Sequence, residues 1–307
     1  MKAVVASPAG VELGEAYAHC RDVARSRARN FYYGLRLTPE PKRSAVFAVY
    51  AWMRTGDDLV DDAGASDAKR VALARFAEAS HAVLDGDGGP APGFGTPLMW
   101  IAFADTVRRF GVERRDVDAM LAGLCEDLDH TGYETMADLR RYCARVASSV
   151  GRVCVTIWGL RGDGPRQVAL TLAEQRGVAF QLTNILRDFA EDLDEGRVYL
   201  PRAVFQRHGV TTAALRRWDE PARCEALVRD VATAARGEYE ASAQLDAMVD
   251  PSCAPTLWAM TQIYAGLLAK IEARPERIVA AERIRLPSLR KAGIAVRAIA
   301  RSKRGRW

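Results

Sequence analysis

The chain has 307 residues, of which 49% are hydrophobic and 27% are charged, and its formal net charge is +5. This composition is typical of a folded globular protein, and it excludes a chain that is fibrous or disordered over most of its length. The charge is unevenly placed, because residues 283–307 hold nine Lys or Arg and no Asp or Glu, whereas residues 1–282 hold 35 basic and 39 acidic side chains.

The elements expected along the chain are helices almost throughout. Ala, Leu, Arg and Glu are frequent, apolar residues recur at steps of three and four, and no alternating Val, Ile and Thr run of the strand type occurs. Gly and Pro cluster at residues 85–97, 161–165 and 251–255, which we interpret as loops between helices. Composition does not change across these loops, so the sequence predicts an all-α fold with a single domain over residues 1–307.

The cysteines and the N-terminus bear on the cellular compartment. The six cysteines are Cys20, Cys125, Cys143, Cys154, Cys224 and Cys253. They include no C-x-x-C pair, so we expect reduced, buried thiols and neither a zinc site nor a disulfide framework. The N-terminus lacks a basic start followed by an apolar core, and no apolar run approaches the roughly 20 residues of a membrane span. These features predict a cytoplasmic protein.

The first candidate for a functional site is a predicted helix over residues 44–62. Its second half carries four aspartates within six residues, and Arg54, Asp57 and Asp61 fall on one face at 3.6 residues per turn. Apolar residues continue that face toward the N-terminus of the helix. Such a run of carboxylates forms either a solvated surface, where like charges repel, or the acidic wall of a binding site.

The second candidate lies in residues 178–201. Its polar residues are Gln181, Asn184, Asp188 and Asp192, at steps of three, four and four, so all of them lie on one face of a helix beside an apolar stripe. Oxygen ligands would then line about 12 Å of the helix at 1.5 Å per residue. Such ligands suit Mg²⁺, which prefers one or two carboxylates, bound waters and substrate phosphate.

Together the two helices predict a pocket with two acidic walls that hold Mg²⁺ and, through it, a diphosphate. Carboxylates alone would repel a diphosphate, so charge requires the metal. Three arginines, Arg54, Arg187 and Arg197, are placed to neutralise a departing diphosphate. Loss of diphosphate from an allylic carbon leaves a carbocation, which needs a dry pocket and is stabilised by aromatic rings.

At these residues the chain resembles the squalene/phytoene synthase family, whose members join two prenyl diphosphates head to head. The resemblance covers about residues 17–290 and depends on residues 50–62 (YAWMRTGDDLVDD), 142–151 (YCARVASSVG) and 181–201 (QLTNILRDFAEDLDEGRVYLP). The last segment is highly specific, whereas the DDxxD of the first is shared with other prenyl diphosphate enzymes. The resemblance implies an isoprenoid synthase fold, with helices around a central apolar cavity and two facing acidic helices.

The resemblance also implies roles for individual residues. The implied Mg²⁺ ligands are Asp57, Asp61, Asn184, Asp188 and Asp192. The implied substrate-binding residues are Arg54, Asp127, Gln181, Arg187, Arg197 and Tyr264. The implied catalytic set is Arg54, Asp57, Asp61, Tyr142, Asp188, Asp192 and Tyr199. Near the N-terminus, residues 26–32 depart from the family's pattern, and Arg27 or Arg29 is expected to supply the diphosphate contact there.

The family's reaction has two stages. One prenyl diphosphate ionises and the double bond of the other captures its C1 cation, giving a cyclopropylcarbinyl diphosphate, which ionises in turn and rearranges to a 1-1′ linked product. NADPH takes part only when the product is squalene, because phytoene formation ends by proton loss. Two C15 farnesyl or two C20 geranylgeranyl diphosphates both agree with the residues, as do the products presqualene diphosphate, hydroxysqualene, squalene, dehydrosqualene and phytoene.

The basic C-terminal segment, residues 283–307, is predicted to form an amphipathic helix. Its apolar stripe is Leu289, Ala292, Val296 and Ile299, with Arg290, Lys291, Arg297 and Arg301 beside it. One interpretation is peripheral contact with the anionic inner face of a membrane, and the other is a solvated terminal helix. A nucleic-acid partner is not expected, because the basic residues form one short segment without interleaved aromatic residues.

Two alternatives to a head-to-head synthase are a class I terpene cyclase or head-to-tail prenyl elongase, and a non-catalytic relative that works on a membrane surface. An elongase usually repeats DDxxD on the second helix, where this chain has NILRDFAED. A non-catalytic relative is expected to lose its metal-binding aspartates, and both sets are present.

Overall fold

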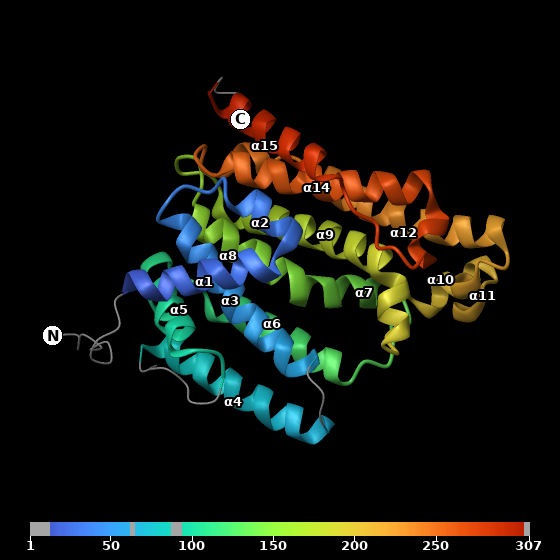
Figure 1. Cartoon of the computed structure of the whole chain (residues 1–307), viewed down its shortest axis with the longest axis horizontal. Coiled ribbons are helices and arrows are strands. Elements are labelled where there is room, and N and C mark those ends of the chain that lie inside the picture. Colours follow the sequence, from blue (N-terminus) through green and yellow to red (C-terminus); the bar gives the residue numbers. More distant parts are fainter. Residues whose placement is uncertain (1–12, 62–64, 87–93, 304–307) are drawn as a thin grey trace.

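The structure is a computed structural model that describes residues 13–61, 65–86 and 94–303, without the side chains of residues 29–31 (Figure 1). Over these ranges the chain forms helices joined by turns and has no strand, apart from an isolated bridge between Leu160 and Val249. The predicted all-α fold is confirmed.

The helices of the first half are α1 (Leu13–Arg27), α2 (Arg29–Leu35), α3 (Lys42–Asp61), α4 (Ser66–Asp85), α5 (Pro97–Phe110), α6 (Arg114–Leu128), α7 (Met136–Cys143), the π-helical turn η1 (Ala144–Ser148) and α8 (Ser149–Trp158). Those of the second half are α9 (Arg166–Asp194), α10 (Arg202–His208), α11 (Thr212–Arg217), α12 (Pro221–Ala241), α13 (Leu245–Met248), α14 (Ala254–Ala273), the 3₁₀ turn η2 (Pro275–Val279) and α15 (Ser288–Lys303).

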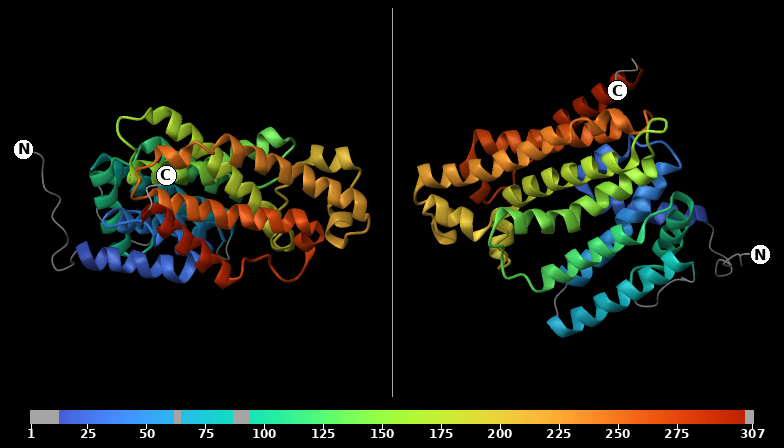
Figure 2. Two further views of the ribbon diagram at one scale, coloured as in Figure 1. Left: turned by 90° about the horizontal axis from the view of Figure 1, so that it is seen from above. Right: turned by 180° about the vertical axis from the view of Figure 1, so that it is seen from behind.

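Helices α3 and α9 are central to the arrangement. Helix α3 contacts α1, α4, α5, α6 and α8, and α9 contacts η1, α7, α8, α12 and α14. The 29 residues of α9 extend over about 43 Å. Figures 1 and 2 show the long helices side by side, with α4 at one edge of the molecule and α14 with α15 at the opposite edge.

Local sequence signals account for several helix ends. Helix α5 begins after Thr96, whose side chain accepts a hydrogen bond from the Met99 backbone N–H, and ends at Gly111 with φ 67°. Helix α7 begins with a capping box between Thr135 and Asp138. All three predicted loops fall between helices, although residues 87–93 lie outside the described part of the chain.

The π-helical turn η1 is pressed between two helices. A Cβ atom on Gly177 of α9 would lie 2.6 Å from the Cα of Ser148, and a Cβ atom on Gly123 of α6 would collide with the side chain of Val146. At Gly177 only glycine lets α9 approach the backbone of η1 so closely, and Gly123 leaves room for the Val146 side chain. The turn therefore fixes how α7 and α8 lie between α6 and α9.

Two sequence expectations are adjusted by the structure. All six cysteines are free, and five are buried as predicted, but Cys125 is exposed because it lies on the outer face of α6. The first acidic helix ends at Asp61, and Asp62 lies outside the described residues. Across the described ranges, no helix combines the length and the hydropathy that crossing a membrane requires.

Candidate active site

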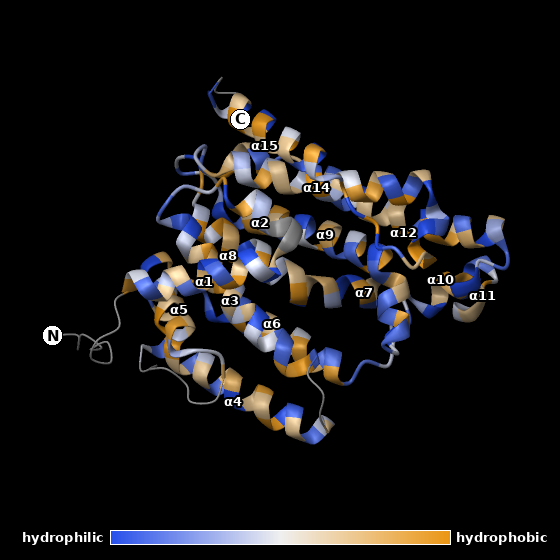
Figure 3. Cartoon of the chain, viewed as in Figure 1, coloured by the Kyte–Doolittle hydropathy of each residue, from blue (hydrophilic) through white to orange (hydrophobic). Residues whose placement is uncertain are grey.

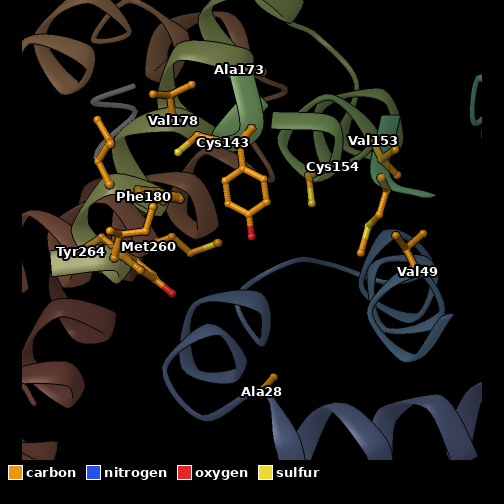
Figure 4. Packing of buried hydrophobic residues seen from close by; sticks show 14 of the residues in the cluster. Ala28, Val49, Cys143, Val153, Cys154, Ala173, Val178, Phe180, Met260 and Tyr264 are labelled. Carbon is orange, nitrogen blue, oxygen red and sulfur yellow. The ribbon is translucent and has the colours of Figure 1, made fainter. Parts of the chain in front are cut away.

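An apolar cavity of about 290 Å³ lies between α3, α6, α8, α9 and α14. Its walls include Val46, Val49 and Met53 of α3 and Phe180 of α9, and Met260 of α14 closes one side. Figure 4 shows Phe180, Met260 and Tyr264 on one side of this core, and Val49, Val153 and Cys154 on the other. The central apolar cavity that the family resemblance implied is present.

The cavity becomes polar toward one end. Asp57, Asp127, Gln181 and Asn184 line this end, one or more turns beyond the apolar residues on α3, α6 and α9. The next turns of α3 and α9 line a separate open pocket of about 700 Å³, which we call the polar mouth. Its residues are Arg54, Val60, Asp61, Lys69, Asp188, Glu191, Asp192, Glu195, Arg197 and Arg283. The predicted pair of acidic walls is therefore assembled at the end of an apolar cavity.

Arginines link the acidic helices. Arg54 hydrogen-bonds to Asp58 and lies 3.7 Å from a carboxylate oxygen of Asp61. Arg197, in the turn after α9, lies 3.3 Å from Asp61 and so connects α9 to α3. Arg27 of α1, one of the two predicted N-terminal diphosphate contacts, donates a hydrogen bond to Asp58 of α3 at 2.7 Å. The side chain of the other, Arg29, lies outside the described residues.

Asp188 is held by two guanidinium groups. Arg187 donates to both of its carboxylate oxygens at 2.7 and 2.5 Å, and Arg283 donates to it at 2.6 Å. Burial raises the pKa of Asp188, but the hydrogen bonds and charges of the two arginines outweigh burial and hold the pKa below its usual value. The Arg187 side chain is only 9% exposed and does not line the polar mouth, so it reaches the site through Asp188.

Asp127 sits beneath a cluster of tyrosines. The hydroxyls of Tyr142 and Tyr199 donate to it at 2.8 and 3.1 Å, and their rings stack at 5.3 Å. Burial raises the pKa of Asp127 to about 6, although the two hydrogen bonds oppose this shift. Tyr133 and His130 pack on the same rings, at 5.3 Å from Tyr142 and 4.7 Å from Tyr199. The three residues predicted from the resemblance thus form one unit.

Two further predicted residues lie deeper on α9 and α14. Asn184 Nδ2 donates to Gln181 Oε1 at 3.4 Å, and both residues line the polar end of the cavity. Tyr264 is buried and stacks on Phe180 at 4.6 Å, behind the cavity wall and beside Arg187. It therefore supports the wall and does not line the cavity.

The residues fit a divalent cation and a diphosphate. Asn184 Oδ1 is a buried acceptor without a hydrogen-bond partner, and the Nε atoms of Arg54 and Arg197 are buried donors without one. Burial together with Asp61 raises the pKa of Asp57 to about 7, and burial together with Asp188 raises the pKa of Asp192 to about 7. Among the described side chains, no three of His, Cys, Asp or Glu converge on one point. The metal-binding role of the aspartates stays a prediction.

Sequence reasoning missed several residues of the site, among them the carboxylates Glu191 and Glu195 of the polar mouth and three cations. Lys69 of α4 and Arg283 line the polar mouth, and Arg283 was assigned only to the basic segment at the C-terminus. Arg176 of α9 lies at the apolar end of the cavity, where Ser242, Asp246 and Thr261 hydrogen-bond its guanidinium. Arg176 directly follows Glu174 and Gln175, so no local apolar pattern marked it as a cavity residue.

An apolar cavity that opens between two acidic helices defines the class of the all-α isoprenoid synthases. The sequence pattern of the squalene/phytoene synthase family matches residues 24–290. The phytoene synthase of Mycobacterium tuberculosis is 37% identical over 298 residues, covering 95% of this chain and 93% of the relative. The phytoene synthase of Arthrospira platensis is 30% identical and covers 90% of each chain.

Comparison with solved structures leads to the same family. A dehydrosqualene synthase with bound ligand has a TM-score of 0.82 at 27% identity, covering 95% of this chain and 98% of that one. A squalene synthase from Alicyclobacillus acidocaldarius has a TM-score of 0.75 at 25% identity, covering 86% and 96%. The chain belongs to the squalene/phytoene synthase family and is a prenyltransferase of the head-to-head type.

The alternatives are not favoured by these comparisons. A linalool/nerolidol synthase from Streptomyces clavuligerus has a TM-score of 0.51 at 18% identity, which shows a shared fold alone. This synthase matches the chain less well than the two head-to-head synthases do.

Proposed function

We propose that the protein condenses two molecules of geranylgeranyl diphosphate into phytoene. The observation that carries the reaction type is the apolar cavity that ends at a charged mouth, since it separates a hydrocarbon chain from a diphosphate group. The C20 substrate is supported by the phytoene synthases that are 37% identical over nearly the whole chain.

The residues of the polar mouth and of the polar end of the cavity divide into two groups. Arg54 and Arg197 bind diphosphate oxygens, because each has a buried Nε–H without a partner. Asp57, Asn184 and Asp188, with Asp61 and Asp192, would hold Mg²⁺. When bound, Mg²⁺ supplies the positive charge that the mouth lacks, since it holds four cationic and five carboxylate side chains.

The cavity walls protect the cation that forms when a diphosphate leaves. Val46, Val49 and Leu124 offer no nucleophile, and they keep water away from the reacting carbons. Tyr50 and Phe180 present aromatic rings to the same space, where a ring face attracts a carbocation. Asp127, held by Tyr142 and Tyr199, keeps a carboxylate at the polar end.

The reaction balances without a reductant. The C1–O bond of the first substrate breaks, the double bond of the second attacks C1, and loss of a proton closes the cyclopropane. The second diphosphate then leaves, the ring rearranges to the 1-1′ bond, and a second proton is lost. Two substrates thus give one C40 hydrocarbon, two diphosphates and two protons. A squalene-type product would instead require a hydride from NADPH.

Mass spectrometry of the product tests the proposal. Purified protein is incubated with Mg²⁺ and either farnesyl or geranylgeranyl diphosphate, with and without NADPH. We expect phytoene from the C20 substrate and no effect of NADPH. A dominant C30 product would contradict the assignment to C20, and a cyclised monomer or a lengthened diphosphate would contradict head-to-head condensation. A hydrocarbon product also agrees with the predicted peripheral location at a membrane, which stays a prediction.

A further inference from the structure

Helix α15 has an apolar face that no other described element covers. Leu289, Val296 and Ile299 are 88%, 65% and 45% exposed, and they are three of the seven exposed large hydrophobic residues in the described ranges. They recur at steps of seven and three, so they lie on one side of the helix. Figure 3 shows hydrophobic and hydrophilic bands alternating along α15 at the edge of the molecule.

The opposite side of α15 anchors it to the protein. Ile294 and Ala298 are buried there, where α15 contacts α14 and α2. Two cations strengthen this attachment, since Lys291 lies 5.4 Å from the ring of Tyr33 and Arg301 lies 5.3 Å from the ring of Trp258. The exposed stripe therefore belongs to a helix that is fixed in orientation.

The charge on α15 is largely uncompensated. Residues 283–303 contain no acid, and Arg290, Arg297 and Lys303 form no ion pair within the described part of the chain. Arg290 and Arg297 lie beside the apolar stripe, about a quarter to a third of a turn away. Most arginines in the other described helices are paired with Asp or Glu, so the unpaired cations Arg290, Arg297 and Lys303 of α15 indicate an anionic partner.

We propose that the exposed face of α15, together with Tyr33 of α2, docks the enzyme on an anionic lipid bilayer. The apolar stripe enters the boundary between head groups and acyl chains, while Arg290, Arg297 and Lys303 contact lipid phosphates. A second copy of the chain fits this face poorly, because pairing two α15 helices would bring ten cationic side chains together with no acid among them.

Docking in this way sets the orientation of the active site. Helices α2 and α14, which support α15, also contribute Leu35, Leu257 and Met260 to the apolar cavity. The wall formed by these two helices is therefore the part of the cavity nearest the bilayer. The choice of a lipid partner rests on the proposed function, since a hydrocarbon product must reach an apolar phase.

Vesicle flotation with the full chain tests the docking surface. We expect binding to vesicles that contain about one third phosphatidylglycerol, weak binding to phosphatidylcholine alone, and release by about 0.5 M salt. The variant Leu289→Gln/Val296→Gln/Ile299→Gln should bind at least about tenfold more weakly, as should Arg290→Gln/Arg297→Gln/Lys303→Gln. The matched control Val71→Gln/Val168→Gln changes two exposed apolar residues on α4 and α9 and should bind like the wild type.

A fluorescent probe locates the contact. In a Cys125→Ser background, a dye on Leu289→Cys should shift to the blue with anionic vesicles, and a dye on Val71→Cys should not. Equal vesicle binding by the wild type and the α15 variants would overturn the proposal, as would a dimer in light scattering that the apolar variant dissociates. Turnover in detergent separates the docking surface from the proposed enzymatic function. The α15 variants should keep their turnover in detergent. If the wild type shows no turnover in detergent, only the enzymatic function is contradicted.

Discussion

Chain-length selection should depend on the end of the cavity farthest from the polar mouth. Cys154 of α8 lines the cavity and is 7% exposed, and Ala173 lies eleven residues, or about 16 Å, before Asn184 on α9. With the diphosphate at the mouth, the last isoprene unit of a C20 chain points toward this end. The variant Cys154→Phe places a ring in that space and should favour a C15 substrate.

The magnitude follows from the hydrocarbon that can no longer be buried. Excluding five carbons costs about 4 kcal/mol at about 0.8 kcal/mol per buried methylene. Since about 1.4 kcal/mol corresponds to a tenfold change, the upper limit is about 10³-fold in the ratio of kcat/KM for geranylgeranyl over farnesyl diphosphate. Partial overlap of the ring with that unit predicts a change between about tenfold and this limit.

The assay is competition between the two substrates, with products counted by mass spectrometry. Cys125→Phe is a matched control, because Cys125 is exposed on α6 and outside the cavity. Overpacking costs about 1–3 kcal/mol, so thermal unfolding is followed in parallel and Cys154→Leu serves as a milder variant. An equal loss of kcat/KM for both substrates in a folded variant would refute the placement of the chain.

Three further predictions concern the polar mouth and the helix packing. Asp188→Asn should lower Mg²⁺-dependent turnover by at least about 100-fold. It should also weaken Mg²⁺ binding, measured by calorimetry in the presence of a prenyl diphosphate analogue whose C1–O bond cannot break, whereas Asp194→Asn should change neither. Unchanged Mg²⁺ binding by Asp188→Asn would contradict its assignment as a metal ligand. Arg283→Gln should raise KM about fivefold to tenfold, because it removes a cation of the polar mouth. Arg285 is exposed and lies outside the polar mouth, so Arg285→Gln is the control. Equal effects of the two substitutions would refute a specific contact between Arg283 and the substrate. In denaturant titrations, Gly177→Ala should lower the free energy of unfolding by about 2 kcal/mol or more. Gly237→Ala, with nothing within 4 Å of its Cβ, should raise that free energy by about 1 kcal/mol. The reverse order of the two variants would contradict the close packing at η1.

The faces of α3 and α9 were predictable because both follow the helical period. Residues at steps of three and four must lie on one side of a helix, so the sequence alone assigns Asp57 with Asp61 and Asn184 with Asp188. The structure adds that Asp57 and Asn184 line one cavity, and that Asp61 and Asp188 line the polar mouth. That the two faces meet was predicted from their shared suitability for Mg²⁺ and diphosphate and from the resemblance to a family, and not from the helical period itself.

Contacts between distant segments were not predictable. Arg283 reaches Asp188 across 95 positions of the chain, and no local pattern distinguishes it from the cations of α15. The hydrogen bonds from Tyr142 and Tyr199 to Asp127 depend in the same way on how α6, α7 and the turn after α9 pack. Hydropathy reports which side of a helix is buried, but it does not report the partner.

The π-helical turn η1 changes which side of the helix the residues before and after it face. Tyr142 and Gly151 both line the cavity, yet nine residues of regular α-helix make two and a half turns and would place them on opposite sides. The wider turn at Ala144–Ser148 takes up one extra residue, worth about 100° of rotation, and so turns the two segments toward each other. If all nine residues were kept but the segment formed regular α-helix, Tyr142 would rotate by about 100° relative to Gly151, and the Asp127 end of the site would turn away from the hydrocarbon end. The wider turn, more than the chemistry of its side chains, therefore lets the continuous helical segment from α7 to α8 serve both the charged and the apolar part of the substrate.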